Sequence, residues 1–177
     1  MKRLICFCAA ILLAFPLGGC DSAQTSAEVY LDSGIADSGE GLTLYFEEEE
    51  AAAQALEEIY ETVDVRGLAF ANRDLLKIKF FINPDYLEEF HVKYASGRYG
   101  VADVFLLKPY PEYRADVRES LEQVKVSRVK EFENFDIYNS YRIAQDAVIF
   151  EQGEYVVMLM LDDTETARAV INRHLPQ

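Results

Sequence analysis

One segment of this 177-residue chain is apolar at every position, and it constrains the fold more than any other feature. It runs from Tyr155 to Leu161, directly before two aspartates. A run this short, preceded by the turn signal Gln152-Gly153, predicts a strand. An antiparallel strand with one face in water would alternate apolar and polar residues. The sequence therefore predicts a central strand that is covered on both faces.

A second strand pair is predicted earlier in the chain. Apolar and polar residues alternate over Phe90–Tyr94, which is typical of a half-buried strand. The glycine-containing turn Ser96–Gly100 follows, and the return strand Val101–Leu107 is almost continuously apolar. A long helix is then expected from about Glu112 to Phe132, with Arg128 interrupting its apolar stripe.

The same order of elements recurs near the C-terminus. Ala147–Phe150 is expected to pair with the apolar strand, and Asp162 or Asp163 is expected to cap a last helix. The unit strand–hairpin–strand–helix thus occurs twice, over about 88–132 and about 146–175.

Two further helices are predicted before these units. One spans about Glu47–Val63 and carries an apolar stripe at helical spacing, and a shorter one follows Asn72, a good N-cap. The predicted fold class is α+β, with a four-stranded, mostly antiparallel sheet. We expect the two helices after the hairpins on one face and the N-terminal helices on the other. The alternative cover for the second face is a partner, in which case that face is a binding site or a dimer interface.

The first twenty residues resemble the leader of a bacterial lipoprotein. Lys2 and Arg3 precede a 14-residue apolar run, Leu4–Leu17, which is too short to span a membrane. Leu17-Gly18-Gly19-Cys20 resembles a lipobox, which implies cleavage before Cys20 and a diacylglycerol on its thiol. The alternative is an ordinary signal peptide with an accidental cysteine.

Three parts of the chain follow from this interpretation. Residues 1–19 are the predicted signal peptide, residues 20–41 the lipidated cysteine with a flexible tether, and residues 42–177 a single domain. Small and polar residues dominate the tether. Its repeated Asp-Ser-Gly, at Asp32 and Asp37, offers too few oxygen ligands for a calcium loop.

Charge and cysteine content narrow the classes of partner. The chain has a net charge of −14, and loss of Lys2 and Arg3 with the leader makes it −16. Such a chain repels a phosphate backbone, so nucleic acid is not an expected partner. Cys6 and Cys8 leave with the leader, so the mature chain has no internal disulfide and no cysteine-based metal site.

Few residues stand out as candidates for chemistry. His91 and His174 are the two histidines, on the polar face of a strand and the apolar stripe of the last helix. Asp162-Asp163 follows a strand end, where capping is the simpler explanation. Arg98 and Tyr99 occupy a hairpin tip and suit contact with a partner. No catalytic residue, metal ligand or cofactor site is predicted.

Four segments resemble a family of uncharacterised bacterial lipoproteins whose domain has no known function. They are Phe81-Ile82-Asn83-Pro84-Asp85, Val101–Lys108, Phe135-Asp136-Ile137-Tyr138-Asn139 and Glu154-Tyr155-Val156-Val157. The resemblance covers about 45–175 and implies a lipoprotein location but no reaction. Many members have glycine in place of Phe81, so this turn is expected to differ here.

Two functions of different classes are compatible with the sequence. The first is a non-catalytic binding domain, lipid-anchored at the extracytoplasmic face of the cell membrane, for an envelope protein or a small molecule. The second is a cell-envelope hydrolase that uses paired carboxylates at about 5–9.5 Å. A cleft with two facing acids and a raised pKa would favour the hydrolase.

Overall fold

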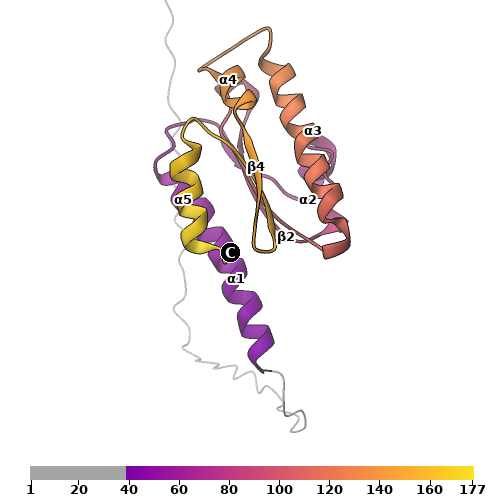
Figure 1. The fold of residues 1–177 in the computed structure, drawn as a ribbon. Helices are drawn as coiled ribbons and strands as arrows, with labels where there is room; N and C mark the ends of the chain where they lie inside the picture. Colours follow the sequence, from indigo (N-terminus) through magenta and orange to yellow (C-terminus); the bar gives the residue numbers. More distant parts are fainter. Residues whose placement is uncertain (1–38) are drawn as a thin grey trace, which may run out of the picture. The chain divides into compact units, whose positions relative to one another are not determined.

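The computed structural model describes residues 39–177, with side chains from Glu50 onward. Residues 38–177 form one compact unit, of which residues 39–177 are drawn in colour in Figure 1. No helix in this described part is long and apolar enough to cross a membrane. The helices are α1 (Gly39–Glu61), α2 (Arg73–Lys79), α3 (Arg114–Phe132), α4 (Ser140–Gln145) and α5 (Thr164–His174), with short 3-10 turns at Pro84–Tyr86, Gly97–Tyr99 and Pro111–Tyr113. The strands are β1 (Leu68–Phe70), β2 (Leu87–Ala95), β3 (Asp103–Pro109), β4 (Val148–Gln152) and β5 (Tyr155–Met160).

The five strands form one antiparallel sheet in the order β1-β2-β3-β5-β4. The α+β class, the two hairpins and the helix after each are confirmed. The predicted number of four strands is wrong because β1 pairs with the edge of β2. With three residues, β1 is too short to show an alternating pattern in the sequence.

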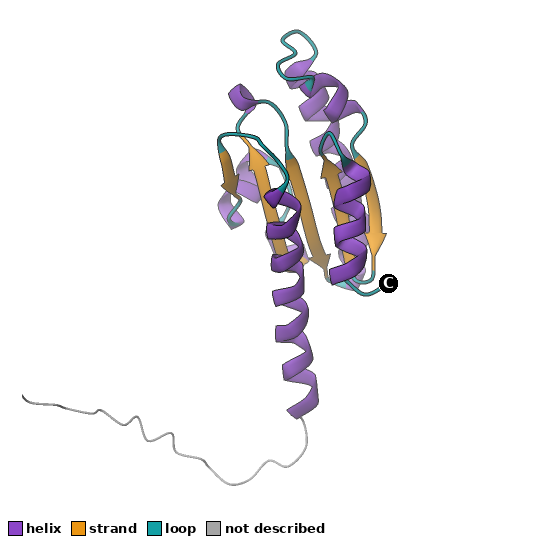
Figure 2. Cartoon of the chain, turned by 90° about the vertical axis from the view of Figure 1, so that its left-hand side faces the viewer, coloured by secondary structure: helices purple, strands orange, loops and turns teal. Residues whose placement is uncertain are grey.

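Both faces of the central strands are covered, as the continuous apolar run predicted. Every residue of β3 and β5 is buried. Alternate side chains enter two cores, one on each side of the sheet. Val104, Leu106, Val157 and Leu159 face α1 and α5, and Phe105, Leu107, Val156 and Met158 face α2, α3 and α4. Figure 2 shows α1 and α5 in front of the sheet.

α3 and α5, the helices that follow the two hairpins, lie on opposite faces, so the prediction that they share one face is wrong. Five strands about 4.8 Å apart span about 19 Å, whereas a helix with its side chains is about 10 Å wide. Each face therefore needs two helices. α5 joins α1 on one face, and α2, which was predicted beside α1, joins α3 on the other.

Several boundaries differ from the predicted ones. α1 begins at Gly39, earlier than the expected Glu47, and α4 was not predicted because it is only six residues long. The second hairpin turns at Gly153–Glu154, one residue later than expected. Asn72 caps α2 as predicted, since its side chain accepts a hydrogen bond from the Leu75 amide at 2.9 Å.

Arg128, the residue that interrupts the apolar stripe of α3, is buried in an ion pair. Its Nε donates to Asp103 Oδ2 at 2.7 Å, and its Nη2 donates to the Ala95 carbonyl at 3.0 Å. Asp103 is fully buried and also accepts from the Ala95 amide at 3.0 Å. Burial raises the pKa of Asp103, against the opposing effect of the Arg128 guanidinium. This pair joins α3 to the β2–β3 hairpin.

Candidate functional site

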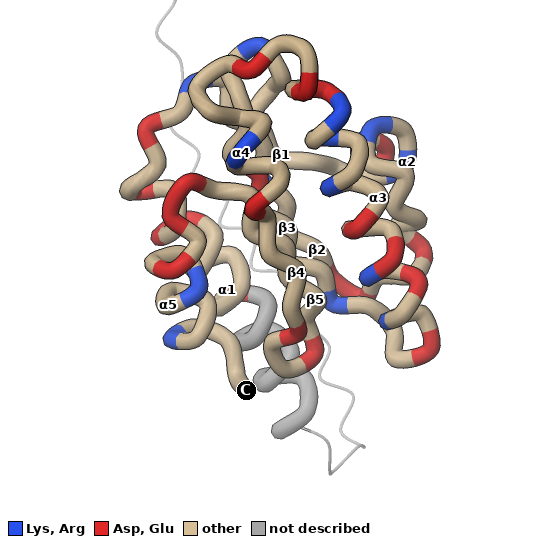
Figure 3. Tube along the Cα trace, turned by 45° about the horizontal axis from the view of Figure 1, so that its top comes forward, with Lys and Arg blue, Asp and Glu red and all other residues tan. Residues whose placement is uncertain are grey.

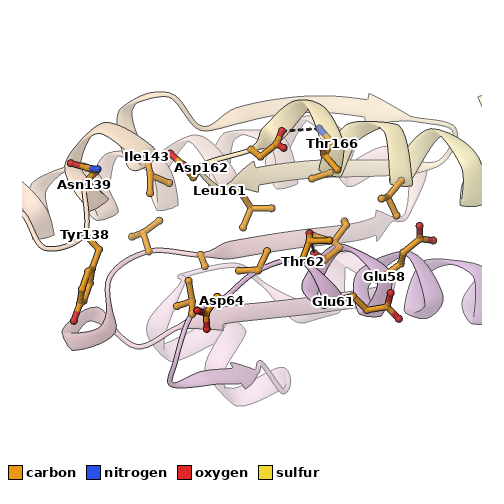
Figure 4. A pocket seen from close by; sticks show the side chains of 18 of the residues that line it. Glu58, Glu61, Thr62, Asp64, Tyr138, Asn139, Ile143, Leu161, Asp162 and Thr166 are labelled. Atoms are coloured by element: carbon orange, nitrogen blue, oxygen red, sulfur yellow. Dashed lines mark hydrogen bonds between the residues drawn. The ribbon is translucent and has the colours of Figure 1, made fainter.

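A cleft of about 1150 Å³ opens at the end of the sheet where β3 begins and β5 ends. Its walls come from the end of α1 and the loop after it, the tip of the β2–β3 hairpin, the start of α4, the turn after β5, and α5 from Thr166 to Arg173. Figure 4 shows Tyr138 and Asn139 at one end and Glu58 at the other. We refer to this feature as the α1–α5 cleft.

The floor of the α1–α5 cleft is apolar. It follows from the antiparallel pairing of β3 and β5, in which Asp103 lies opposite Met160, so that the residues just beyond these strand ends come together. The buried floor residues are Ile59, Val101, Ala102, Leu161, Ala167 and Val170. An apolar floor of this kind gives a bound ligand area to bury.

The rim of the cleft is mainly acidic. Five carboxylates line it, with two guanidiniums, those of Arg66 and Arg173. The hydrogen bond from His174 lowers the pKa of Glu58, and Arg173 adds to the effect. The hydrogen bond from the backbone of Thr166 likewise lowers the pKa of Asp163. Both carboxylates are therefore ionised at neutral pH.

Two residues with left-handed backbones form one end of the cleft. Tyr138 has φ 55° and Asn139 has φ 59°, and the Tyr138 side chain is 79% exposed. Ser140 holds this loop in place, because its hydroxyl donates to the Ile137 carbonyl and accepts from the Val101 amide at 3.1 Å. The strained backbone therefore presents an aromatic ring at the cleft mouth.

Glycine is required where the hairpin tip meets this loop. Gly100 has φ 90°, and a Cβ there would lie 2.8 Å from Ser140 Oγ. The close approach brings the hairpin tip to the start of α4, two segments almost forty residues apart in sequence.

Two of the predicted candidate positions meet in the cleft. Tyr99 lines it, and the guanidinium of Arg98 lies 4.8 Å from the centre of the Tyr99 ring. Asp162 and Asp163 also line it. Of the two residues predicted to cap α5, Asp163 does so by accepting from the Thr166 amide at 2.9 Å, and Asp162 forms an ion pair with Arg142.

The two histidines form separate pairs. His91 Nε2 lies 2.6 Å from Glu89 Oε1 on β2, and His174 Nε2 lies 2.7 Å from Glu58 Oε2 on α1. Glu89 also accepts from the Tyr155 hydroxyl at 2.8 Å. The described part of the chain contains no group of three or more His, Cys, Asp or Glu residues placed to hold a metal ion.

Other predicted features lie outside the described residues. These are the leader, Cys20 and the Asp-Ser-Gly repeats that begin at Asp32 and Asp37, apart from Gly39, the last residue of the second repeat and the first residue of α1. Conversely, the sequence predicted no site role for Glu58, Asp64 or Tyr138, which all line the cleft; Tyr138 was named only within a segment that resembles the family. The sequence shows a tyrosine before an asparagine, but neither its exposure nor its neighbours in space.

Comparison with known proteins identifies the domain but gives it no activity. No curated protein and no solved structure matches the chain. Residues 61–161, more than half of the chain, match the family described as Domain of unknown function (DUF4358). The match includes β1 to β5, the hairpin tip and the start of α4, but ends before α5. The chain therefore belongs to this family of domains of unknown function.

Proposed function

We propose that this protein is a lipoprotein anchored through Cys20 to the extracytoplasmic face of the cell membrane, and that its domain binds a ligand without catalysis. The leader supports the anchor: basic residues, a 14-residue apolar run and the Leu17-Gly18-Gly19-Cys20 box occur in the expected order. Two acyl chains on one cysteine are enough for stable attachment.

The α1–α5 cleft is the observation that carries the binding function. It combines an apolar floor with polar groups at the rim, the composition typical of ligand sites. It also contains strained backbone at Tyr138 and Asn139, a feature that clusters at functional sites.

Two acids of the cleft, Glu58 and Asp163, favour binding over hydrolysis. A glycosidase needs one carboxylic acid with a raised pKa to protonate the leaving group. In the cleft, the pKa values of Glu58 and Asp163 are lowered instead. Among the described acids, Asp103 has a raised pKa, and it is buried against Arg128 on α3.

Methyl NMR on the full chain in lipid nanodiscs tests the binding site. A mixed set of small molecules and short peptides should contain members that shift the methyl signals of Ala102, Ala167 and Ala169, which line the cleft. Ala169→Trp fills the cleft from an exposed position and should abolish these shifts. Ala115→Trp, at an exposed position of α3, is the matched control. Ligands that shift only methyls elsewhere would contradict the proposal.

A further inference from the structure

Negatively charged side chains lie together at the C-terminal end of α1, where the helix dipole disfavours them. The C-terminus of a helix carries the negative end of its dipole and favours cations. The last turn of α1 has no basic residue, and Glu58, Glu61 and Asp64 all line the cleft at or just beyond it. Arg173 and His174 of α5 balance Glu58. Glu61 and Asp64 are exposed, so this wall favours a positively charged occupant.

The facing wall has the same sign. Asp162 and Asp163 line the cleft before the start of α5. Figure 4 shows Asp162 across the cleft from Asp64, which follows the end of α1. Arg142 pairs with Asp162. Arg173 and Arg142 thus offset Glu58 and Asp162. Three lining carboxylates remain against one lining guanidinium, that of Arg66, so the lining keeps an excess of two negative charges, from among Glu61, Asp64 and Asp163. Close walls of one sign reinforce each other's field, so the mouth attracts cations.

The volume of the cleft and the apolar and aromatic groups that line it indicate the size of the ligand and the side chains it carries. About 1150 Å³ exceeds the range of about 300–1,000 Å³ usual for small-molecule sites. The floor offers Leu161, Ala167 and Val170 to apolar groups, and Tyr138 offers an exposed ring at one end. A cation placed over such a ring is attracted by its π-electrons.

From this charge, size and surface we infer that the α1–α5 cleft takes a basic peptide segment with interspersed apolar side chains. The inference rests on the proposed binding function and assigns the class of ligand. The basic groups lie against Glu61 and Asp64, and the apolar side chains lie on the floor.

Calorimetric titration of the full chain, in nanodiscs of zwitterionic phosphatidylcholine, tests this ligand class. The probes are the hexapeptide Lys-Leu-Lys-Leu-Lys-Leu and its counterparts with glutamate or serine in place of lysine. The lysine peptide should bind most tightly. Glu61→Lys combined with Asp64→Lys should weaken its binding about tenfold, since two exposed attractions become repulsions. Glu119→Lys with Glu122→Lys, at exposed positions of α3, makes the same charge change and should have no such effect.

The outcomes separate the ligand class from the binding function. The ligand class is overturned if the glutamate or serine peptide binds as tightly as the lysine peptide, if none of the three binds, or if both double variants behave alike. If a non-basic peptide binds and Ala169→Trp abolishes its binding, the cleft is a binding site but its ligand is not a basic peptide. If Ala169→Trp leaves the binding of the lysine peptide unchanged, the cleft is not the binding site, and both the proposed function and the proposed ligand class are wrong.

Discussion

Phe81 combines two unfavourable features in one residue. It has φ 57°, a left-handed backbone that glycine adopts easily, and its side chain is 78% exposed. It follows the last residues of α2, where the amide of Ile82 donates to the Leu76 carbonyl at 3.0 Å. A left-handed residue, usually glycine, commonly ends a helix in this way. The turn thus has a geometry suited to glycine, although phenylalanine occupies it.

Phe81→Gly should stabilise the domain relative to Phe81→Ala. Both changes remove the exposed ring, but only glycine relieves the left-handed strain, which is about 1–2 kcal/mol for other residues. After the greater flexibility of unfolded glycine is subtracted, we expect a difference of about 1 kcal/mol. Urea unfolding of the two variants measures it. Equal unfolding free energies would show that the backbone at Phe81 is not strained.

Glu58 gives one residue-scale prediction about pH. Its pKa is lowered from the ordinary 4.5, chiefly by the hydrogen bond with His174. A lowered pKa means that the stabilisation is complete above pH 4.5 and is lost as the pH falls through the folded-state pKa. Glu58→Gln should therefore lower the thermal midpoint at pH 7, and this difference should shrink below pH 4.5. Glu122→Gln on α3 removes the same charge and serves as the control. A pH-independent difference would contradict the pairing.

At the scale of elements, the Asp103–Arg128 pair fixes α3 on the sheet. Asp103 begins β3, Ala95 ends β2, and Arg128 reaches both from the last third of α3. Arg128 Nη1 also donates to Glu131 at 2.7 Å. A buried charge that loses its partner destabilises a fold strongly, whereas removal of both charges costs less.

Arg128→Met should lower the free energy of unfolding by about 3–5 kcal/mol, because it leaves the Asp103 carboxylate buried and unpaired. Asp103→Asn keeps an acceptor for the Ala95 amide and removes the charge. The double variant should therefore be more stable than the sum of the single effects predicts. Denaturant unfolding of the four proteins in a double-mutant cycle measures this coupling. Additive effects would argue against the buried pair.

At the scale of the whole molecule, the net charge restricts how the protein can be attached to a membrane. The net charge is −14, and Figure 3 shows acidic positions spread over the helices and loops. A protein surface with this negative charge interacts favourably with water, and an anionic lipid surface repels it. The proposed attachment therefore depends on acyl chains and not on surface charge.

Labelled palmitate fed to cells that express the full chain should be incorporated into the protein. Cys20→Ser removes the thiol that accepts the lipid in the proposed lipobox, and it should abolish the label. Cys8→Ser lies within the leader and should leave incorporation intact. If the Cys20→Ser protein still carries the label, the proposal that the protein is a lipoprotein anchored at Cys20 is wrong.

Local sequence determined the longer elements and their buried faces, whereas β1 and α4 are too short to show a pattern. The unbroken apolar run Tyr155–Leu161 required cover on both sides of the sheet, because such side chains alternate between two faces. Asn72 and the pair Asp162-Asp163 marked helix starts, because Asn72 and Asp163 satisfy backbone amides only a few residues ahead. These interactions are short-range, so a single segment contains all of the information.

Only the tertiary structure decided how the elements combine. An apolar stripe on α5 shows that one side of the helix is buried, but not which face of the sheet it covers. Because five strands are wider than a single helix, α1 does not cover its face alone, and α5 packs beside it. Likewise, the cleft depends on Asp64, Tyr138 and Asp162, which are far apart in sequence and meet because β3 and β5 pair antiparallel. The partner of a buried face is chosen by packing across the whole molecule, and no periodicity within one segment records that choice.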